Sequence, residues 1–223
     1  MSKNFYNTRE VKMKVERIAE GIYRILVPFE DDITTTVYVA VCGEKVILID
    51  AASYSTDASE FILPALSEIE IAPSQVDSLV LTHSHKDHAG GAKALLSALS
   101  CLKPRASFFV DHPGFSYLTD GEILGERLQV ITLPGHTENS IALFDIKTKT
   151  LLSADCLQLN GIGKYRRGVA FPTLYRKSIE RLKGMDIYRI VAAHEYDPLG
   201  SIAEGTANVL EYLNECLKYS LLG

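Results

Sequence analysis

The sequence predicts a layered fold of mixed α-helices and β-strands. Short apolar runs rich in β-branched residues cluster early in the chain, and later runs of the same kind alternate with stretches of helical periodicity. Short runs bounded by turn residues are typical of strands, whereas apolar residues three and four positions apart are typical of helices. Strands that first cluster and then alternate with helices indicate sheets and helices arranged in layers.

Each expected element of the first half has a local signal. Turn-forming letters such as "EG", "EDD" and "CGE" separate four strands, expected over residues 15–19, 22–28, 35–41 and 46–50. Apolar side chains at helical spacing predict a helix over 56–69, which Pro64 makes imperfect. A strand over 77–82 and a helix over 89–99 complete this half.

The second half alternates the two kinds of element. Strands are expected over 107–110, 128–133, 140–145, 150–154 and 187–193, and helices over 175–183 and 202–219. In the last helix, helical spacing predicts one buried stripe formed by Ile202, Val209, Leu213 and Leu217. Residues 1–12 are expected to be a loosely held N-terminal extension, and residues 13–223 a single domain, since no stretch has the composition of a linker.

Composition excludes several classes of function. The net charge of −5 argues against nucleic acid as a partner, because such binding depends on Lys and Arg. Cysteines 42, 101, 156 and 216 form no CxxC pair, which favours a reducing compartment. The polar N-terminus lacks a signal peptide, and no apolar run approaches the roughly 18 residues of a membrane span. We expect a cytoplasmic protein that acts on a small molecule away from membranes, and a homodimer stays open.

The histidines are the most informative feature of the sequence. In "HSHKDH", His83, His85 and His88 fall within six positions, joined by Asp87. In extended chain His83 and His85 project to the same side, because side chains alternate with a period of two. Asp87 and His88 follow where a helix is expected to begin, so they can point toward a second centre. Neutral imidazoles and carboxylates are ligands of zinc and similar divalent ions.

Three further candidates follow predicted strands at their C-terminal ends: His136, Asp155 and His194. Loops at such ends can converge on one point. A single histidine there is more often a surface or core residue than a ligand, but no packing or capping rule requires three imidazoles in six positions. Five histidines and two aspartates exceed the needs of one tetrahedral ion and fit two ions that share a carboxylate. The sixth histidine, His112, is expected in a surface turn.

With these motifs, the sequence resembles the metallo-β-lactamase superfamily of hydrolases. The resemblance extends from about Val15 over nearly the whole chain and includes "TTVYVAVCGEKVILIDAA", "LTHSHKDHAGG", "LPGHTENSIALF", "LLSADCL" and "VAAHEY". It implies an α+β fold, the four-layer αββα sandwich, with the ions at one edge. It also implies that His83, His85 and His136 hold the first ion, that Asp87, His88 and His194 hold the second, and that Asp155 bridges both.

The resemblance also implies a role for Asp50, which ends the "VILID" run. In the family this position supports the ligands from behind, and metal-bound imidazoles generally need such acceptors. The alternative is an aspartate that caps the next turn.

The implied reaction is metal-assisted hydrolysis. A hydroxide that bridges two divalent ions (zinc first, with iron or manganese as alternatives) is a nucleophile at neutral pH. Asp155 and Asp87 would be the catalytic carboxylates, the first by holding both ions and the second by taking part in proton transfer. A non-catalytic metal-binding protein is the alternative from a different class.

Local motifs favour a small thioester or ester as the substrate. The run "SADCLQLNGIGKY" resembles the glyoxalase II (hydroxyacylglutathione hydrolase) branch and places Lys164 and Tyr165 in a substrate-binding loop. Tyr196, beside His194, matches a thiol-cofactor contact of that branch. Homoserine-lactone lactonases resemble the sequence in their metal-binding string but carry Tyr where this sequence has Gln158, so lactonase is an alternative rather than the first choice, as is phosphodiesterase. The branch's second loop tyrosine aligns with Arg166, and a solvated basic turn is the other interpretation of residues 161–168.

Overall fold

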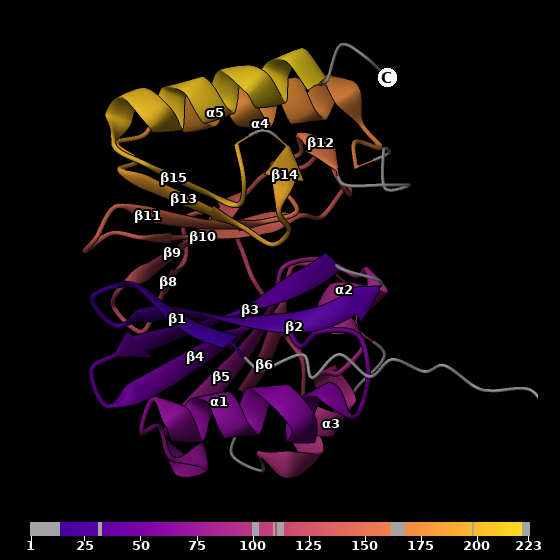
Figure 1. Cartoon of the computed structure of the whole chain (residues 1–223), viewed down its shortest axis with the longest axis vertical. Helices are drawn as coiled ribbons and strands as arrows, with labels where there is room; N and C mark the ends of the chain where they lie inside the picture. Colours follow the sequence, from indigo (N-terminus) through magenta and orange to yellow (C-terminus); the bar gives the residue numbers. More distant parts are fainter. Residues whose placement is uncertain are drawn as a thin grey trace, which may run out of the picture.

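A computed structural model describes residues 14–30, 33–99, 103–108, 110, 114–161, 168–197 and 199–219. Two sheets pack face to face, and helices cover their outer faces (Figure 1). Helices α1 (Leu63–Glu68) and α3 (Ala92–Ala98) lie outside the first sheet, and α4 (Pro172–Lys183) and α5 (Thr206–Tyr219) lie outside the second. These four layers confirm the α+β sandwich. No helix within these ranges is long and apolar enough to cross a membrane.

The first sheet begins as an antiparallel meander and continues as a parallel sheet. Its strands, in spatial order, are β1 (Lys14–Ala19), β2 (Ile22–Glu30), β3 (Ile33–Cys42), β4 (Lys45–Ile49), β5 (Val76–Leu81), β6 (Lys103–Ala106) and β7 (Ser116–Tyr117). Two-residue turns join β1 to β2 and β3 to β4, and each contains a glycine at positive φ, Gly21 at 68° and Gly43 at 65°. From β4 to β7 the pairing is parallel, so the C-terminal ends of these strands share one edge.

The crossover from β4 to β5 explains the imperfect helix predicted around Pro64. A π-helical turn, η1 (Ala58–Ile62), runs into α1, and Pro64 lies in the first turn of α1. Proline has no N–H to donate, and it lies where the π-helical turn passes into the α-helix. A short 3₁₀ segment, η2 (Pro73–Gln75), then leads into β5.

The helix predicted over 89–99 is divided into α2 (Lys86–Ala89) and α3. The division falls at Gly90 and Gly91, where a Cβ atom would lie 2.1 Å from the carbonyl oxygens of Ser53 and Ala51 respectively. Only glycine permits this approach of two backbones. The amide of Ala51 also donates to the carbonyl of His88 at 2.7 Å. The glycine pair thus fixes α2 against the end of β4.

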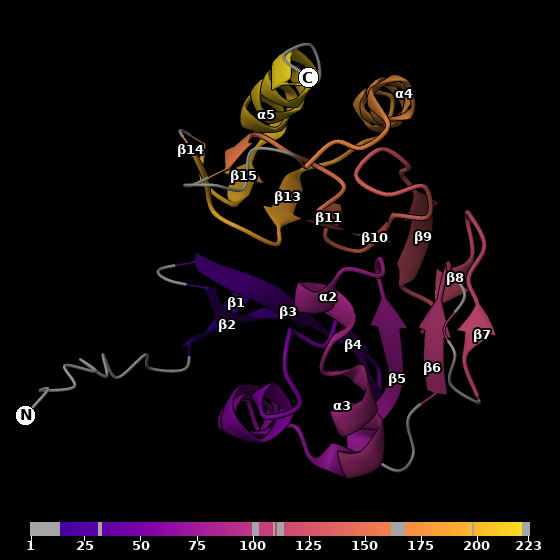
Figure 2. The same cartoon turned by 90° about the vertical axis from the view of Figure 1, so that its right-hand side faces the viewer.

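The second sheet has six strands: β15 (Ile202–Glu204), β13 (Arg189–Ala192), β11 (Thr150–Ala154), β10 (Ile141–Asp145), β9 (Leu128–Thr132) and β8 (Ile123–Leu124). A two-stranded ribbon of β12 (Asn160–Gly161) and β14 (Tyr196–Asp197) lies beside it. Figure 2 shows the two sheets edge on, with α4 and α5 above the second sheet. Residues such as Tyr38, Ile141 and Val191 fill the interface between the sheets, and further apolar layers lie beneath the helices.

Two expected elements are wrong in position. The strand predicted over 107–110 lies at residues 103–106 instead and is β6. The segment "KPRA" is polar, but it forms a strand because it pairs in parallel with β5. The final helix begins at Thr206 rather than at residue 202, since residues 202–204 pair with β13 and Gly205 follows at a φ of 89°. Ile202 therefore does not belong to the buried stripe. The buried residues of α5 are Val209, Tyr212, Leu213 and Cys216, with Leu217 partly buried.

Candidate metal centre

Every predicted ligand follows the C-terminal end of a strand, and all of these ends meet at one edge of the sandwich. The short segment that connects β5 to α2, together with the first turn of α2, supplies His83, His85, Asp87 and His88. His136 follows β9, Asp155 follows β11, and His194 follows β13. The structure thus brings together seven side chains that are up to 111 positions apart, His83 to His194. They form two groups, and each group draws residues from both sheets.

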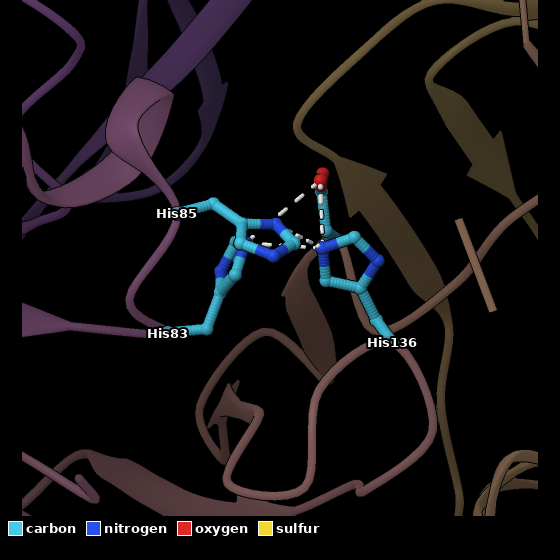
Figure 3. A group of neighbouring side chains, drawn as sticks. His83, His85 and His136 are labelled. Carbon is cyan, nitrogen blue, oxygen red and sulfur yellow. Dashed lines mark hydrogen bonds and ion pairs between the residues drawn. The ribbon is translucent and has the colours of Figure 1, made fainter. Parts of the chain in front are cut away.

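The first group consists of His83, His85, His136 and Asp155. Nε2 of His136 lies 3.1 Å from Nε2 of His83 and 2.8 Å from Nδ1 of His85. Oδ2 of Asp155 lies 3.4 Å from the same His136 nitrogen. Figure 3 shows the rings of His83 and His85 on one side and the ring of His136 opposite them, with their nitrogens facing a common point. Three imidazole nitrogens and one carboxylate oxygen are a ligand set that suits a divalent ion.

The second group consists of Asp87, His88, Asp155 and His194. Nε2 of His194 lies 3.1 Å from Oδ2 of Asp87 and 3.4 Å from Oδ1 of Asp155. Nε2 of His88 lies 3.4 Å and 3.6 Å from the same two oxygens. Asp155 therefore directs Oδ2 at the first group and Oδ1 at the second.

Hydrogen bonds behind the second group define which ring nitrogens face it. Nδ1 of His88 lies 2.7 Å from Oδ2 of Asp50, and Nδ1 of His194 lies 2.8 Å from the carbonyl oxygen of Thr34. Because both partners are acceptors, each Nδ1 carries a proton, and Nε2 is the nitrogen that faces the group and is available to an ion. Asp50 is fully buried at the end of β4, at a φ of 66°.

The first group is arranged in the same way. Nδ1 of His136 donates to the carbonyl of Gly168 at 2.5 Å. The hydroxyl of Thr82 donates to Asp50 at 2.8 Å, so its lone pair accepts the Nδ1 proton of His83 at 3.1 Å. The Nε2 atoms of His83 and His136 therefore present lone pairs to each other across 3.1 Å. Facing lone pairs repel one another unless a cation or a proton lies between them.

Two buried atoms of the second group indicate that an ion fits there. Nε2 of His88 and Oδ1 of Asp155 have no hydrogen-bond partner, although both are shielded from water. A buried polar atom without a partner costs about 1–3 kcal/mol, and more if it is charged. A cation between these atoms would remove that cost. The orphaned atoms, the inward lone pairs and the mixed His and Asp donors together fit two divalent ions.

Without an ion, protons on the imidazoles of His88 and His194 balance the carboxylates of the second group, and a bound ion would displace those protons. Burial raises the pKa of Asp155, but the imidazoles of His194 and His88 outweigh burial and hold that pKa well below its usual range. Burial lowers the pKa of His194, yet the Asp155 and Asp87 carboxylates outweigh it and raise the pKa to about 10. Burial and the neighbouring imidazole of His88 lower the pKa of His83. The carboxylates are therefore ionised at neutral pH and attract positive charge.

Of the predicted substrate-binding residues, the structure describes Tyr196. Lys164, Tyr165 and Arg166 lie outside the described residues, as does His112, so these assignments stay predictions. Tyr196 is 5% exposed, its ring centre is 6.5 Å from that of His194, and its hydroxyl has no hydrogen-bond partner.

Gln158 is buried beneath the site. Its side-chain amide donates to the backbone carbonyl of Asp155 at 2.9 Å, so it supports the turn that carries the shared carboxylate.

Sequence reasoning missed four features of this edge. The acceptors Thr82, Gly168 and Thr34 orient imidazoles, but two of them act through backbone carbonyls, which leave no sequence signal. Lys86 is exposed between two predicted ligands, and its ammonium lies 4.1 Å from the ring centre of Tyr54. In the sequence, only the position of Lys86 inside "HSHKDH" indicates that it lies near the ligands.

The sequence is similar to a known family and to proteins of that family. The sequence model described as "Metallo-beta-lactamase superfamily" matches residues 31–194. A hydroxyacylglutathione hydrolase from Aeromonas salmonicida is 34% identical over 140 residues, which cover 60% of this chain and 53% of that protein. A beta-lactamase-like protein 2 homolog from Caenorhabditis elegans is 27% identical over 195 residues, 81% of this chain and 63% of the relative. The chain thus spans about half to two thirds of the length of these relatives.

Solved structures share the fold at lower sequence identity. The DIM-1 metallo-beta-lactamase superposes with a TM-score of 0.75 at 14% identity, over 95% of this chain and 97% of that one. At this identity the likeness concerns the fold alone.

Proposed function

Because the chain belongs to the metallo-β-lactamase superfamily, we propose that it is a hydrolase that holds two divalent metal ions, one in each ligand group. The observation that carries the proposal is the placement of Asp155. Its two oxygens face different groups, Oδ2 at 3.4 Å from His136 Nε2 and Oδ1 at 3.4 Å from His194 Nε2. Zinc is the first choice, since imidazole with carboxylate suits it, and iron or manganese are the alternatives.

When bound, such a pair of ions supplies a nucleophilic water at neutral pH and polarises the scissile carbonyl. Residues of the chain position the ions and accept a proton. Asp155 fixes the position of one group relative to the other, because it supplies an oxygen to each. The acceptors behind the imidazoles keep each ring in the tautomer that can bind an ion. Asp87 lies 3.1 Å from His194 within the second group, and its ionised carboxylate can accept the proton that the attacking water loses. No serine or cysteine nucleophile is needed.

For the substrate we propose a small thioester or ester. Support comes from the 34% identity with a hydroxyacylglutathione hydrolase and from the run that contains Lys164 and Tyr165. Gln158 has no hydroxyl to offer at the position where lactonases carry Tyr, and its amide is bound to the backbone carbonyl of Asp155. In this proposal Lys164 and Tyr196 bind the polar part of the substrate. Free, buried thiols at Cys42 and Cys156 are consistent with a cytoplasmic location, which is part of the proposal.

The first experiment measures metal content and replaces Asp155. Elemental analysis of the loaded parent protein should find two ions per chain. Asp155→Asn keeps the side-chain volume but removes the shared charge, so it should lose bound metal and most activity. His112→Ala, which removes the one histidine outside the ligand set, is the control and should change neither. A parent that binds one ion at saturation contradicts the two-ion model.

The second experiment addresses the substrate. Zinc- and manganese-loaded protein is assayed on a panel of thioesters, lactones and phosphodiesters. We expect thioesters or esters to be preferred, and Lys164→Ala to raise KM more than it lowers kcat, because a charge remote from the reacting carbon stabilises ground and transition states alike. Preference for a lactone or a phosphodiester would reject the thioesterase assignment and leave the metallohydrolase standing.

A further inference from the structure

A buried arginine spans the interface between the sheets and reaches the segment that follows His194. Arg24 lies on β2 and is 6% exposed. Its Nε donates to Oε2 of Glu16 at 2.6 Å on its own sheet. Its NH1 donates to the hydroxyl of Ser201 at 2.7 Å, directly before β15 of the second sheet, and lies 3.9 Å from a carboxylate oxygen of Glu195. One guanidinium thus joins the two sheets at the edge that carries the ligands.

The partners of Arg24 close the loop that begins at His194. Ser201 donates its backbone amide to Oε2 of Glu195 at 3.0 Å and its hydroxyl to Oε1 at 2.5 Å. The carbonyl of Ser201 accepts the amide of Ala192 at 2.8 Å. The residue after His194 is therefore tied to Ser201, and Ser201 is tied both to β13 and to Arg24.

The residues before His194 are held by the same sheet. The hydroxyl of Thr36 donates to the carbonyl of Ala193 at 2.8 Å, and the hydroxyl of Tyr38 donates to that of Val191 at 3.1 Å. With the bond from His194 Nδ1 to Thr34, strand β3 holds the chain up to His194, and Arg24 on the neighbouring strand holds the chain after it. In Figures 1 and 2, β2 and β3 lie directly opposite β13 across the interface.

We propose that Arg24 is a positioning residue for His194 and thereby sets the affinity of the second ion. The inference rests on the two-ion function proposed above. His194 is the ligand of the second group that follows β13, whereas Asp87 and His88 come from the first sheet and Asp155 also serves the first group. Ligands must be held to within roughly 0.5 Å of their working geometry. Loosening the loop after His194 therefore weakens the second ion and leaves the first in place.

The test is a metal titration of Arg24→Met, which keeps a long apolar stem and removes all the hydrogen bonds. Metal-free parent and variant are titrated with zinc by calorimetry and with cobalt, whose visible spectrum reports the coordination of each ion. Loss of a group that supports a ligand typically costs about tenfold to a hundredfold in metal affinity. We expect that loss for the second ion only. Ser201→Ala should reproduce part of it, and Arg24→Lys should restore part of it.

Arg127 offers a matched control. It too is a buried arginine between the sheets, bound to Asp145 at 2.7 Å and to the carbonyl of Val41 at 2.9 Å, but it lies at the start of β9, the end opposite His136. Arg127→Met leaves the fully buried Asp145 unpaired, so it should lose at least as much stability as Arg24→Met and still keep the affinity of the second ion.

Each outcome of the titration decides something. Unchanged second-ion affinity in both Arg24→Met and Ser201→Ala, with two ions in the parent, overturns the inference and leaves the proposed function intact. Equal loss in Arg127→Met also overturns it, since the effect would then be general destabilisation. Fewer than two ions in the parent reject the proposed function, and the inference with it. If Arg24→Met does not fold, Ser201→Ala and Arg24→Lys carry the test.

Discussion

Asp50→Asn should turn His88 from a metal ligand into a hydrogen-bond donor without changing the shape of the site. Oδ1 of Asp50 accepts the backbone amide of Thr82 at 2.8 Å, and Oδ2 accepts both the Thr82 hydroxyl at 2.8 Å and Nδ1 of His88 at 2.7 Å. An asparagine can keep the first bond only by placing its amide nitrogen where Oδ2 was. The new NH₂ then faces the Nδ1–H of His88. The clash of two donors is removed if His88 moves its proton to Nε2, which points into the second group.

The size of the effect follows from this geometry. Binding an ion at Nε2 requires the proton to return to Nδ1, where it faces the asparagine NH₂ and stays buried without an acceptor. An unsatisfied buried donor costs about 1–3 kcal/mol. With a tenfold change in affinity equal to about 1.4 kcal/mol, the second ion should bind roughly tenfold to a hundredfold more weakly. The first ion should be affected less, because His83 contacts Asp50 only through the hydroxyl of Thr82.

Calorimetry of the metal-free protein measures both affinities, and nitrogen NMR of the imidazoles identifies the protonated nitrogen of His88. Asp57→Asn is the matched control, because Asp57 is buried in the loop after β4 and accepts the amides of Ser53 and Tyr54 without touching a histidine. A second ion that binds Asp50→Asn as tightly as the parent would refute the reasoning, as would a proton that stays on Nδ1.

Three further predictions concern stability. Asp145→Asn breaks the buried pair with Arg127 and should cost about 3–5 kcal/mol in urea unfolding, with metal content unchanged. Burial raises the pKa of Asp145, but the Arg127 hydrogen bonds outweigh it and lower that pKa, so the pair stabilises fully above about pH 4 and the difference between variant and parent should shrink at lower pH. Chelation should lower the melting temperature, since a site filled at 100 times its Kd contributes about 2.7 kcal/mol; an unchanged temperature would exclude resident ions. Gly91→Ala places a Cβ 2.1 Å from the carbonyl of Ala51 and should cost more than about 1 kcal/mol, whereas Gly184→Ala meets only an ordinary contact and serves as the control.

The ligand groups could be predicted from sequence because their signal is local and chemical. Three imidazoles in six residues have no structural explanation, and strand ends are recognisable from the apolar runs before them. The acceptors that orient the rings could not be predicted in the same way. The carbonyls of Thr34 and Gly168 act through the backbone, so any residue type at these positions would supply the same acceptor.

The two misplaced elements have a common cause, which is pairing that composition does not reveal. Residues 103–106 read "KPRA" and lack the β-branched residues typical of strands, yet they add to β5 in parallel. The sequence pattern predicts that residue 202 begins the last helix, because Ile202 fits the apolar stripe of that helix. In the structure residues 202–204 complete the edge of the second sheet next to β13. In both cases a neighbouring strand, distant in sequence, overrides the local preference.

The origin of the ligands explains how the site depends on the fold. Four of the seven come from one short segment after β5, whose geometry is set locally by the turn into α2 and by the two glycines behind it. The other three come from separate strand ends of the second sheet, so neither group is complete until the sheets have packed. The apolar interface around Tyr38, Ile141 and Val191 can supply that packing without ions. Ions then bind only to the assembled form, and each adds its binding free energy to the docking of the two sheets rather than to the folding of either one.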